Sequence, residues 1–163
     1  MNNLLEQAIS FALSRHKGQV DKANNPYILH LLRVSLSLLP NKPLAVVGVL
    51  HDVIEDGHAT EKELTNEFGK EIARLVMILT RRPDEHYMQT YENVPSYIDR
   101  VCQNYNALLV KLADINDHLS NINDIPDQRE EHSLRKRYER AKIYLEKALV
   151  DGPYPMPTNP RRP

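Results

Sequence analysis

The chain of 163 residues is long enough for one domain with a buried core, and its 41% apolar and 26% charged residues are typical of a soluble globular protein. Its 21 basic and 22 acidic residues give a net charge of −1, which argues against binding nucleic acid or acidic membranes through bulk charge, although not against a local basic pocket. The single cysteine excludes an intrachain disulfide, and the longest apolar run, residues 44–50, is far below the ~20 residues of a membrane helix, so we expect a cytoplasmic protein without a membrane span.

Helical spacing of apolar residues dominates the chain, and alternating strand patterns are scarce. A loop is expected over residues 18–26, where Asn24-Asn25-Pro26 forms a turn signal. Pro43 favours the first turn of a helix that we expect to continue to about Asp56. In chain order, the predicted helices cover residues 4–15, 27–39, 43–56, 60–68, 70–79, 93–103, 105–120 and 128–149.

Local signals divide the second half of the chain. Thr60 and Glu63 have the spacing of a capping box at the start of a helix. Residues 81–91 are polar and predict a loop, and the proline-rich segment 151–163 predicts a flexible tail. The sequence therefore predicts one all-α domain over residues 1–150, a helical bundle, followed by that tail.

A histidine and three carboxylates occur together in an otherwise apolar helix. At about 100° per residue, His51, Asp52, Glu55 and Asp56 would share one sector of the predicted helix 43–56. One interpretation is a solvated acidic face, but such faces usually carry Lys and Arg as well. The other is a cation site, because three carboxylates this close repel one another unless they are protonated, solvated or neutralised.

Two further polar residues lie within apolar helices. His30 alone is compatible with a hydrogen-bonded core histidine, and Asp114 alone with an ion pair to Lys111 three residues earlier. Burying these side chains together with His51 and Asp52 is costly unless they share a partner. A shared metal ion accounts for all four residues at once.

The order His30, His51-Asp52 and Asp114 resembles the H…HD…D signature of HD-domain metal phosphohydrolases. Flanking blocks resemble, in order and spacing, the hydrolase domain of the RelA/SpoT alarmone enzymes and their small stand-alone relatives, over roughly residues 5–120. These blocks are His16-Lys-Gly-Gln19, Pro26-Tyr-Ile-Leu-His30, Leu50-His-Asp-Val-Ile-Glu-Asp56, Phe68-Gly-Lys-Glu-Ile72, Leu79-Thr80 and Val110-Lys-Leu-Ala-Asp114.

The resemblance implies an HD-domain helical bundle and roles for six residues. Glu55 and Asp56 match the acidic pair of the hydrolytic step, and the expected cofactor is a divalent metal, Mn²⁺ in many family members. Two imidazoles and two carboxylates suit Mn²⁺, and on a six-coordinate ion they leave two positions for water and a phosphate oxygen. The residues that match the metal ligands are His30, His51, Asp52 and Asp114.

Candidate substrate contacts are Lys22, Arg81 and His118. At the positions of Asp21 and Lys22 the alarmone hydrolases usually carry Arg-Lys, and that Arg packs against the guanine base. In this chain Asp21 replaces the Arg, while Lys22 is kept and remains a candidate for contacting a phosphate. His118 replaces an Asn that contacts the nucleoside, and its other interpretation is a surface histidine. Arg81 either contacts distal phosphates or is simply solvated. These departures indicate an altered substrate, because the metal and acid positions are kept.

The leading hypothesis is a metal-dependent nucleotide phosphohydrolase, with a (p)ppGpp-like 3′-pyrophosphate as its substrate. A second hypothesis is a phosphatase for another nucleotide, such as a 5′-nucleotide or a phosphorylated dinucleotide. A third is a nucleotide-binding module without turnover, and the fourth is a helical scaffold without a site. Nucleic acid and membranes are not expected partners, and the sequence leaves the oligomeric state open.

Overall fold

The computed structural model describes residues 4–88 and 96–152, and the regular elements within these ranges are helices. The predicted all-α class is therefore confirmed. The elements are α1 (Leu4–Arg15), α2 (Ile28–Ser37), α3 (Lys42–Leu50), α4 (Glu61–Phe68), α5 (Lys70–Leu79), α6 (Tyr97–Cys102), α7 (Tyr105–Ser120), the short 3₁₀ helix η1 (Ile122–Asp124) and α8 (Gln128–Asp151).

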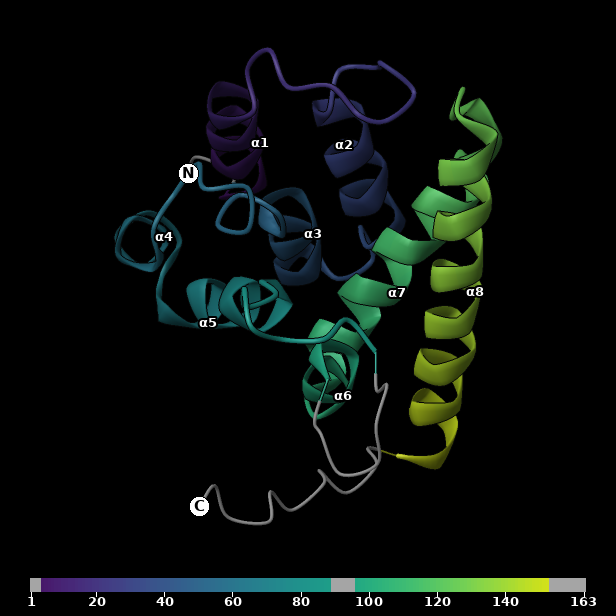
Figure 1. The fold of residues 1–163 in the computed structure, drawn as a ribbon. Coiled ribbons are helices and arrows are strands. Elements are labelled where there is room, and N and C mark those ends of the chain that lie inside the picture. The colour runs from purple at the N-terminus through teal and green to yellow at the C-terminus, as the bar shows by residue number, and fades with distance from the viewer. Residues whose placement is uncertain (1–3, 89–95, 153–163) are drawn as a thin grey trace.

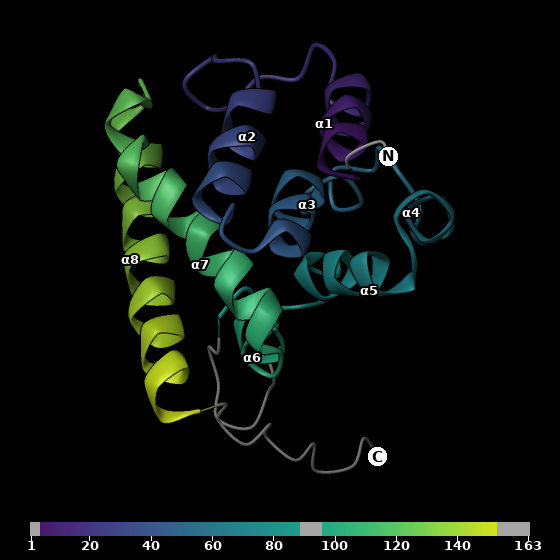
Figure 2. The same cartoon turned by 180° about the vertical axis from the view of Figure 1, so that it is seen from behind.

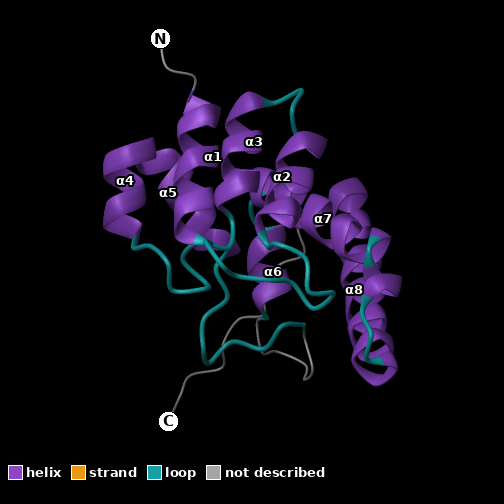
Figure 3. Ribbon diagram, turned by 90° about the horizontal axis from the view of Figure 1, so that it is seen from above, coloured by secondary structure: helices purple, strands orange, loops and turns teal. Residues whose placement is uncertain are grey.

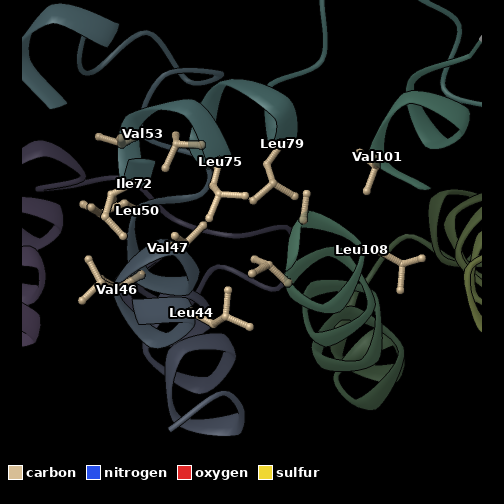
Figure 4. Packing of buried hydrophobic residues seen from close by; sticks show 14 of the residues in the cluster. Leu44, Val46, Val47, Leu50, Val53, Ile72, Leu75, Leu79, Val101 and Leu108 are labelled. Atoms are coloured by element: carbon tan, nitrogen blue, oxygen red, sulfur yellow. The ribbon is translucent and has the colours of Figure 1, made fainter. Parts of the chain in front are cut away.

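Helix α3 lies at the centre of the bundle, where it packs against α1, α2, α5 and α7 (Figures 1 and 2). Its residues 44–50 are all buried, as expected for a helix that is apolar around its whole circumference. Figure 4 shows Leu44, Val47 and Leu50 among buried side chains of α5 and α7. The long helix α8 packs along α7 at one side of the molecule (Figure 3). The core therefore holds α2, α3 and α7 in fixed relative positions.

Helices α2 and α3 approach each other closely at Gly48. A Cβ atom built there would lie 2.9 Å from Leu38 Cδ1 and 3.2 Å from the Ser35 Cα atom. We expect Gly48→Ala to destabilise the fold, because overpacking costs about 1–3 kcal/mol, whereas the gain in helix propensity is ~1 kcal/mol. Urea unfolding should give a lower midpoint, corresponding to about 1 kcal/mol. An unchanged or higher midpoint would contradict this packing.

Helix α3 ends earlier than predicted. It stops at Leu50 instead of continuing to Asp56, and residues 51–57 form a series of turns. The Gly48 carbonyl, which a continuing helix would offer to the amide of Asp52, accepts a hydrogen bond from His51 Nδ1 at 2.8 Å. The turns close at Gly57, whose φ of 76° favours glycine. The predicted helical sector of acids is therefore wrong, although its side chains still face one cavity, as described below.

The other predicted boundaries agree with the structure more closely. The capping box of Thr60 and Glu63 is present at the start of α4. Helix α6 begins only at Tyr97, because Ser96 has extended backbone and caps it; residues 93–95 of the predicted helix lie outside the described residues.

The predicted division into a domain and a tail stays a prediction. Helix α8 continues to Asp151, and residues 153–163 lie outside the described residues. Within residues 4–88 and 96–152, none of the helices combines the length and apolar character needed to cross a bilayer.

Candidate active site

A cavity of about 420 Å³ opens between α2, α7, α8, the loop over residues 18–26 and the turns over residues 51–57. Side chains that the sequence predicts to carry chemistry share its wall: His30, Asp52, Glu55, Asp56, Asp114 and His118. Lys22 and Arg81 line the same cavity. The fold therefore brings the predicted acids and substrate contacts to one place.

The four predicted metal ligands converge from three parts of the fold. His30 comes from α2, His51 and Asp52 from the end of α3, and Asp114 from α7. The Nε2 atom of His30 lies 3.3 Å from Asp114 Oδ1 and 3.8 Å from Asp52 Oδ2. The Nε2 atom of His51 lies 3.1 Å from Asp52 Oδ2 and 3.6 Å from Asp114 Oδ1. Each histidine nitrogen thus lies within 4 Å of an oxygen from both carboxylates.

Three of these donor atoms are buried without a hydrogen-bond partner within the described structure: His30 Nε2, His51 Nε2 and Asp114 Oδ1. A buried polar group left unsatisfied costs about 1–3 kcal/mol, so three together at one point need a common partner. Two imidazole nitrogens and carboxylate oxygens are ligands for a first-row divalent ion. The donor set therefore fits the divalent metal that the sequence predicts.

Outer contacts fix the orientation of the ligands. The His30 ring bonds through Nδ1 to Asp117 Oδ2 at 2.7 Å, which directs Nε2 toward the donor group. Asp117 is itself held by Arg33, whose Nε donates to Oδ1 at 2.6 Å. Tyr27 donates its hydroxyl proton to Asp52 Oδ2 at 2.5 Å. Such outer partners are a regular part of metal sites with histidine ligands.

Replacing Asp117 by asparagine is expected to weaken divalent-metal affinity about 10–100-fold. Asparagine loses the negative charge that holds both the His30 ring and Arg33, so the ligand is less well oriented. Calorimetric titration with Mn²⁺ measures the affinity, and Asp151→Asn at the exposed end of α8 is the matched control. Equal affinities of the two variants would contradict the orienting role of Asp117.

The carboxylates of this group are held in the ionised form. Burial raises the pKa of Asp52, but the charge and hydrogen bond of the His51 imidazole, together with the charge of His30, hold that pKa well below its usual range. Burial likewise raises the pKa of Asp114, but the Lys111 ammonium, 2.7 Å from its Oδ2, together with the imidazoles of His118 and His30, holds that pKa well below its usual range. Lys111 thus pairs with one oxygen of Asp114 while the other oxygen faces the histidines. The predicted ion pair between Asp114 and Lys111 is therefore confirmed, and the metal-ligand role of Asp114 stays a prediction.

The two predicted catalytic acids occupy different environments at the cavity. Glu55 Oε2 accepts a hydrogen bond from the Arg81 backbone N–H at 2.8 Å. Burial raises the pKa of Glu55 and dominates over the lowering effect of that hydrogen bond. Asp56 Oδ2 accepts a hydrogen bond from the side-chain amide of Gln19 at 2.7 Å. The surroundings of Glu55 therefore favour its protonated form.

The three predicted substrate residues differ in their freedom to contact a ligand. The Lys22 ammonium forms an ion pair with Glu130 on α8, which the sequence did not indicate. Arg81 is exposed at the cavity and holds Glu55 through its backbone.

His118 is partly buried and lines the cavity, and its role as a substrate contact stays a prediction. The His118 ring stacks between the rings of His30 and Tyr138, at centroid distances of 4.5 and 4.8 Å. Its Nε2 atom lies 3.1 Å from Asp114 Oδ1.

Sequence reasoning missed several residues of the site. Gln19 and Tyr27 lie in motif blocks that resemble the family, but these blocks do not predict which residues the two side chains contact. Asp117 follows Asp114 by three residues and so shares its helix face, which is a signal that could have found it. Tyr138 lies on the apolar stripe of α8, which by itself indicates core packing.

An HD-domain family model matches residues 8–148. The chain belongs to the HD-domain family. This result agrees with the converging His, His-Asp and Asp residues and confirms the family that the sequence resembles.

Curated relatives of this HD-domain chain carry alarmone-enzyme names. A GTP pyrophosphokinase from Myxococcus xanthus is 32% identical over 152 residues, which are 87% of this chain and 20% of that protein. A probable guanosine-3′,5′-bis(diphosphate) 3′-pyrophosphohydrolase from Mycoplasma genitalium is 30% identical over 168 residues, covering 95% of this chain and 23% of that protein. The chain thus spans about a fifth of the length of the curated relatives it matches.

A solved structure described as a metazoan ortholog of SpoT, which hydrolyzes ppGpp and plays a role in starvation responses, has the same fold. It aligns with a TM-score of 0.67 over 98% of this chain and 90% of that chain, at 22% sequence identity. The predicted HD-domain bundle is therefore confirmed at the level of the fold.

Proposed function

We propose that this chain is a metal-dependent nucleotide phosphohydrolase, whose first candidate substrate is a (p)ppGpp-like nucleotide 3′-pyrophosphate. The observation that carries the proposal is the convergence of unpartnered buried donor atoms from His30, His51 and Asp114 beside Asp52 and the two acids. The names of the 30–32% identical relatives support the substrate class.

In this proposal His30, His51, Asp52 and Asp114 hold one divalent ion, with Mn²⁺ as the first choice. When bound, such an ion lowers the pKa of water and polarises a phosphoryl oxygen. The protein supplies ionised carboxylates from Asp52 and Asp114, and oriented imidazoles from the two histidines.

Glu55 and Asp56 move the protons. Attack by water forms a bond from its oxygen to phosphorus, and the bond from phosphorus to the 3′ oxygen breaks. One carboxylate accepts the water proton, and a proton is delivered to the leaving oxygen, so that pyrophosphate and a 3′ hydroxyl result. The burial-raised pKa of Glu55 suits the donation of that proton.

Substrate recognition differs from the guanine-stacking pattern at Asp21. One carboxylate oxygen of Asp21 accepts hydrogen bonds from the backbone amides of Ala23 and Asn25, at 2.9 and 2.8 Å. Asp21 thus shapes the loop and cannot stack as a guanidinium does. Lys22 has to leave Glu130 to contact a phosphate, and Arg81 and His118 are the other candidate contacts.

The test is a panel of nucleotides incubated with the Mn²⁺-loaded protein, with separate measurement of pyrophosphate and orthophosphate. Pyrophosphate released from ppGpp is the expected result. Orthophosphate from a 5′-nucleotide or a phosphorylated dinucleotide would replace this substrate with the second hypothesis. Stabilisation by one nucleotide without turnover would overturn the enzymatic proposal in favour of a binding module. The cytoplasmic location, the oligomeric state and the absence of nucleic-acid partners stay predictions.

A further inference from the structure

A hydrogen-bonded cluster lies beside the metal ligands and ends on Asp56. It consists of His16 just after α1, Gln19 in the following loop, and Asp56 and His58 after α3. The Gln19 side-chain oxygen lies 2.7 Å from His16 Nδ1 and 2.8 Å from His58 Nε2. The Gln19 side-chain nitrogen lies 2.7 Å from Asp56 Oδ2. We call these four residues the Gln19 cluster.

The contacts determine the orientation of the Gln19 amide. If the amide were turned over, its oxygen would face the Asp56 carboxylate oxygen at hydrogen-bond distance without a proton between them. The amide nitrogen therefore donates to Asp56, and the amide oxygen accepts from both imidazoles. It follows that His16 carries a proton on Nδ1 and His58 carries one on Nε2.

The cluster is anchored on both sides. The His16 ring is buried and contacts the rings of Tyr27 and His58, at centroid distances of 5.4 and 4.8 Å. Arg15 donates through Nη1 to the His58 carbonyl at 2.9 Å. The backbone of Gln19 is bonded at both its amide and its carbonyl. Asp56, by contrast, is an exposed residue on a turn, so the Gln19 amide supplies an orientation that the backbone does not.

Most donor atoms of the Gln19 cluster have hydrogen-bond partners, unlike those of the predicted metal site. His16, Asp56 and His58 have the composition of a cation site, and their nearest donor atoms lie close together. However, the atoms that face Gln19 are already hydrogen-bonded to it, and within the described structure His16 Nε2 is the one buried atom of the cluster without a partner. At the predicted metal site three such atoms, from His30, His51 and Asp114, lie together. The geometry thus favours a hydrogen-bonded clamp over a second metal.

We propose that Gln19 is a positioning residue that holds the Asp56 carboxylate at the reaction cavity, with His16 and His58 fixing the direction of its amide. This inference rests on the proposed hydrolytic function, because it assigns Gln19 an effect on turnover through Asp56. It goes further by naming the residue that gives the acid its orientation.

A double-mutant cycle tests whether Gln19 acts through Asp56. Gln19→Leu is expected to lower kcat about 10–100-fold, as is typical for removal of a partner that orients a site residue, while KM and Mn²⁺ affinity stay unchanged. In the Asp56→Asn background the same substitution should cost little more, because the carboxylate that it positions is gone. Losses that multiply in the double variant, or an unchanged kcat for Gln19→Leu, would overturn the proposal.

Gln19→Glu separates positioning from a purely structural role. A glutamate still accepts hydrogen bonds from both histidines but places a negative charge against Asp56, so kcat should fall at least as far as in Gln19→Leu. A Glu variant with wild-type kcat would mean that Gln19 only holds the two histidines, and the proposal would fail.

Nitrogen-15 NMR of the histidine rings tests the amide orientation without any substrate. The wild type should show the Nδ1–H tautomer for His16 and the Nε2–H tautomer for His58. The opposite tautomers would overturn the Gln19 proposal alone, even if the protein releases pyrophosphate from ppGpp. A wild type with the expected tautomers but without turnover of any nucleotide would instead reject the hydrolytic function, and the positioning role with it.

Discussion

Replacing Asp52 by alanine is expected to remove both divalent-metal binding and hydrolysis. The substitution takes away the oxygen that lies 3.1 Å from His51 Nε2 and 3.8 Å from His30 Nε2, and with it one of two negative charges in the donor set. Metal-assisted stabilisation of the transition state is worth several kcal/mol, so the rate should fall about 10³-fold or more.

Metal content, nucleotide turnover and circular dichroism together measure this effect. Helix content should change little, because Asp52 lies after the end of α3 and carries no helix-capping contact. Asp151→Ala, which removes an exposed carboxylate at the end of α8, should behave as the wild type. Wild-type rates in Asp52→Ala would contradict the proposed mechanism.

Replacing Glu55 by glutamine has the second largest expected effect, a fall in kcat of about 10²–10⁴-fold, the usual contribution of general acid–base catalysis. Glutamine keeps an oxygen that can accept the Arg81 backbone N–H but cannot exchange a proton at neutral pH. Metal affinity should stay within a few-fold of the wild type, because Glu55 is not among the converging donor atoms.

Steady-state kinetics with ppGpp and calorimetry with Mn²⁺ separate these two quantities. Glu67→Gln on the exposed face of α4 is the matched control. If Glu55→Gln instead lost its metal while kcat per bound metal stayed constant, Glu55 would be a metal ligand and the assigned role would be wrong.

Much of the fold was predictable from the sequence because its signals are local. Helical spacing of apolar residues, the capping box of Thr60 and Glu63, and the apolar circumference of α3 each act within a few residues. The convergence of His30, His51, Asp52 and Asp114 was predictable for a different reason. Polar groups within apolar helices need partners, and two imidazoles with two carboxylates are typical ligands of one divalent metal ion.

The end of α3 was not predictable, because it depends on a side chain that competes with the backbone. His51 bonds to the Gly48 carbonyl, and the chain turns while its composition still favours a helix. The predicted helical sector placed the two acids on one face of a helix. In the structure Glu55 contacts Arg81, which follows it by 26 residues, and Asp56 contacts Gln19, which precedes it by 37 residues.

Contacts with α8 also could not be predicted from the sequence. The pairing of Lys22 with Glu130 and the stacking of His118 on Tyr138 join residues whose separation in the chain leaves no periodic signal. The sequence therefore did not show these contacts of Lys22 and His118, although all three candidate substrate residues line the cavity.

Titration of the metal-free wild type with Mn²⁺, followed by calorimetry and thermal unfolding, tests most directly whether the four side chains hold one ion. The expected result is one bound ion per chain, with stabilisation of about 2.7 kcal/mol when free Mn²⁺ is 100 times its dissociation constant, and loss of both effects in Asp52→Ala. A folded wild type that takes up no Mn²⁺ and unfolds at the same temperature with and without it would contradict this assignment.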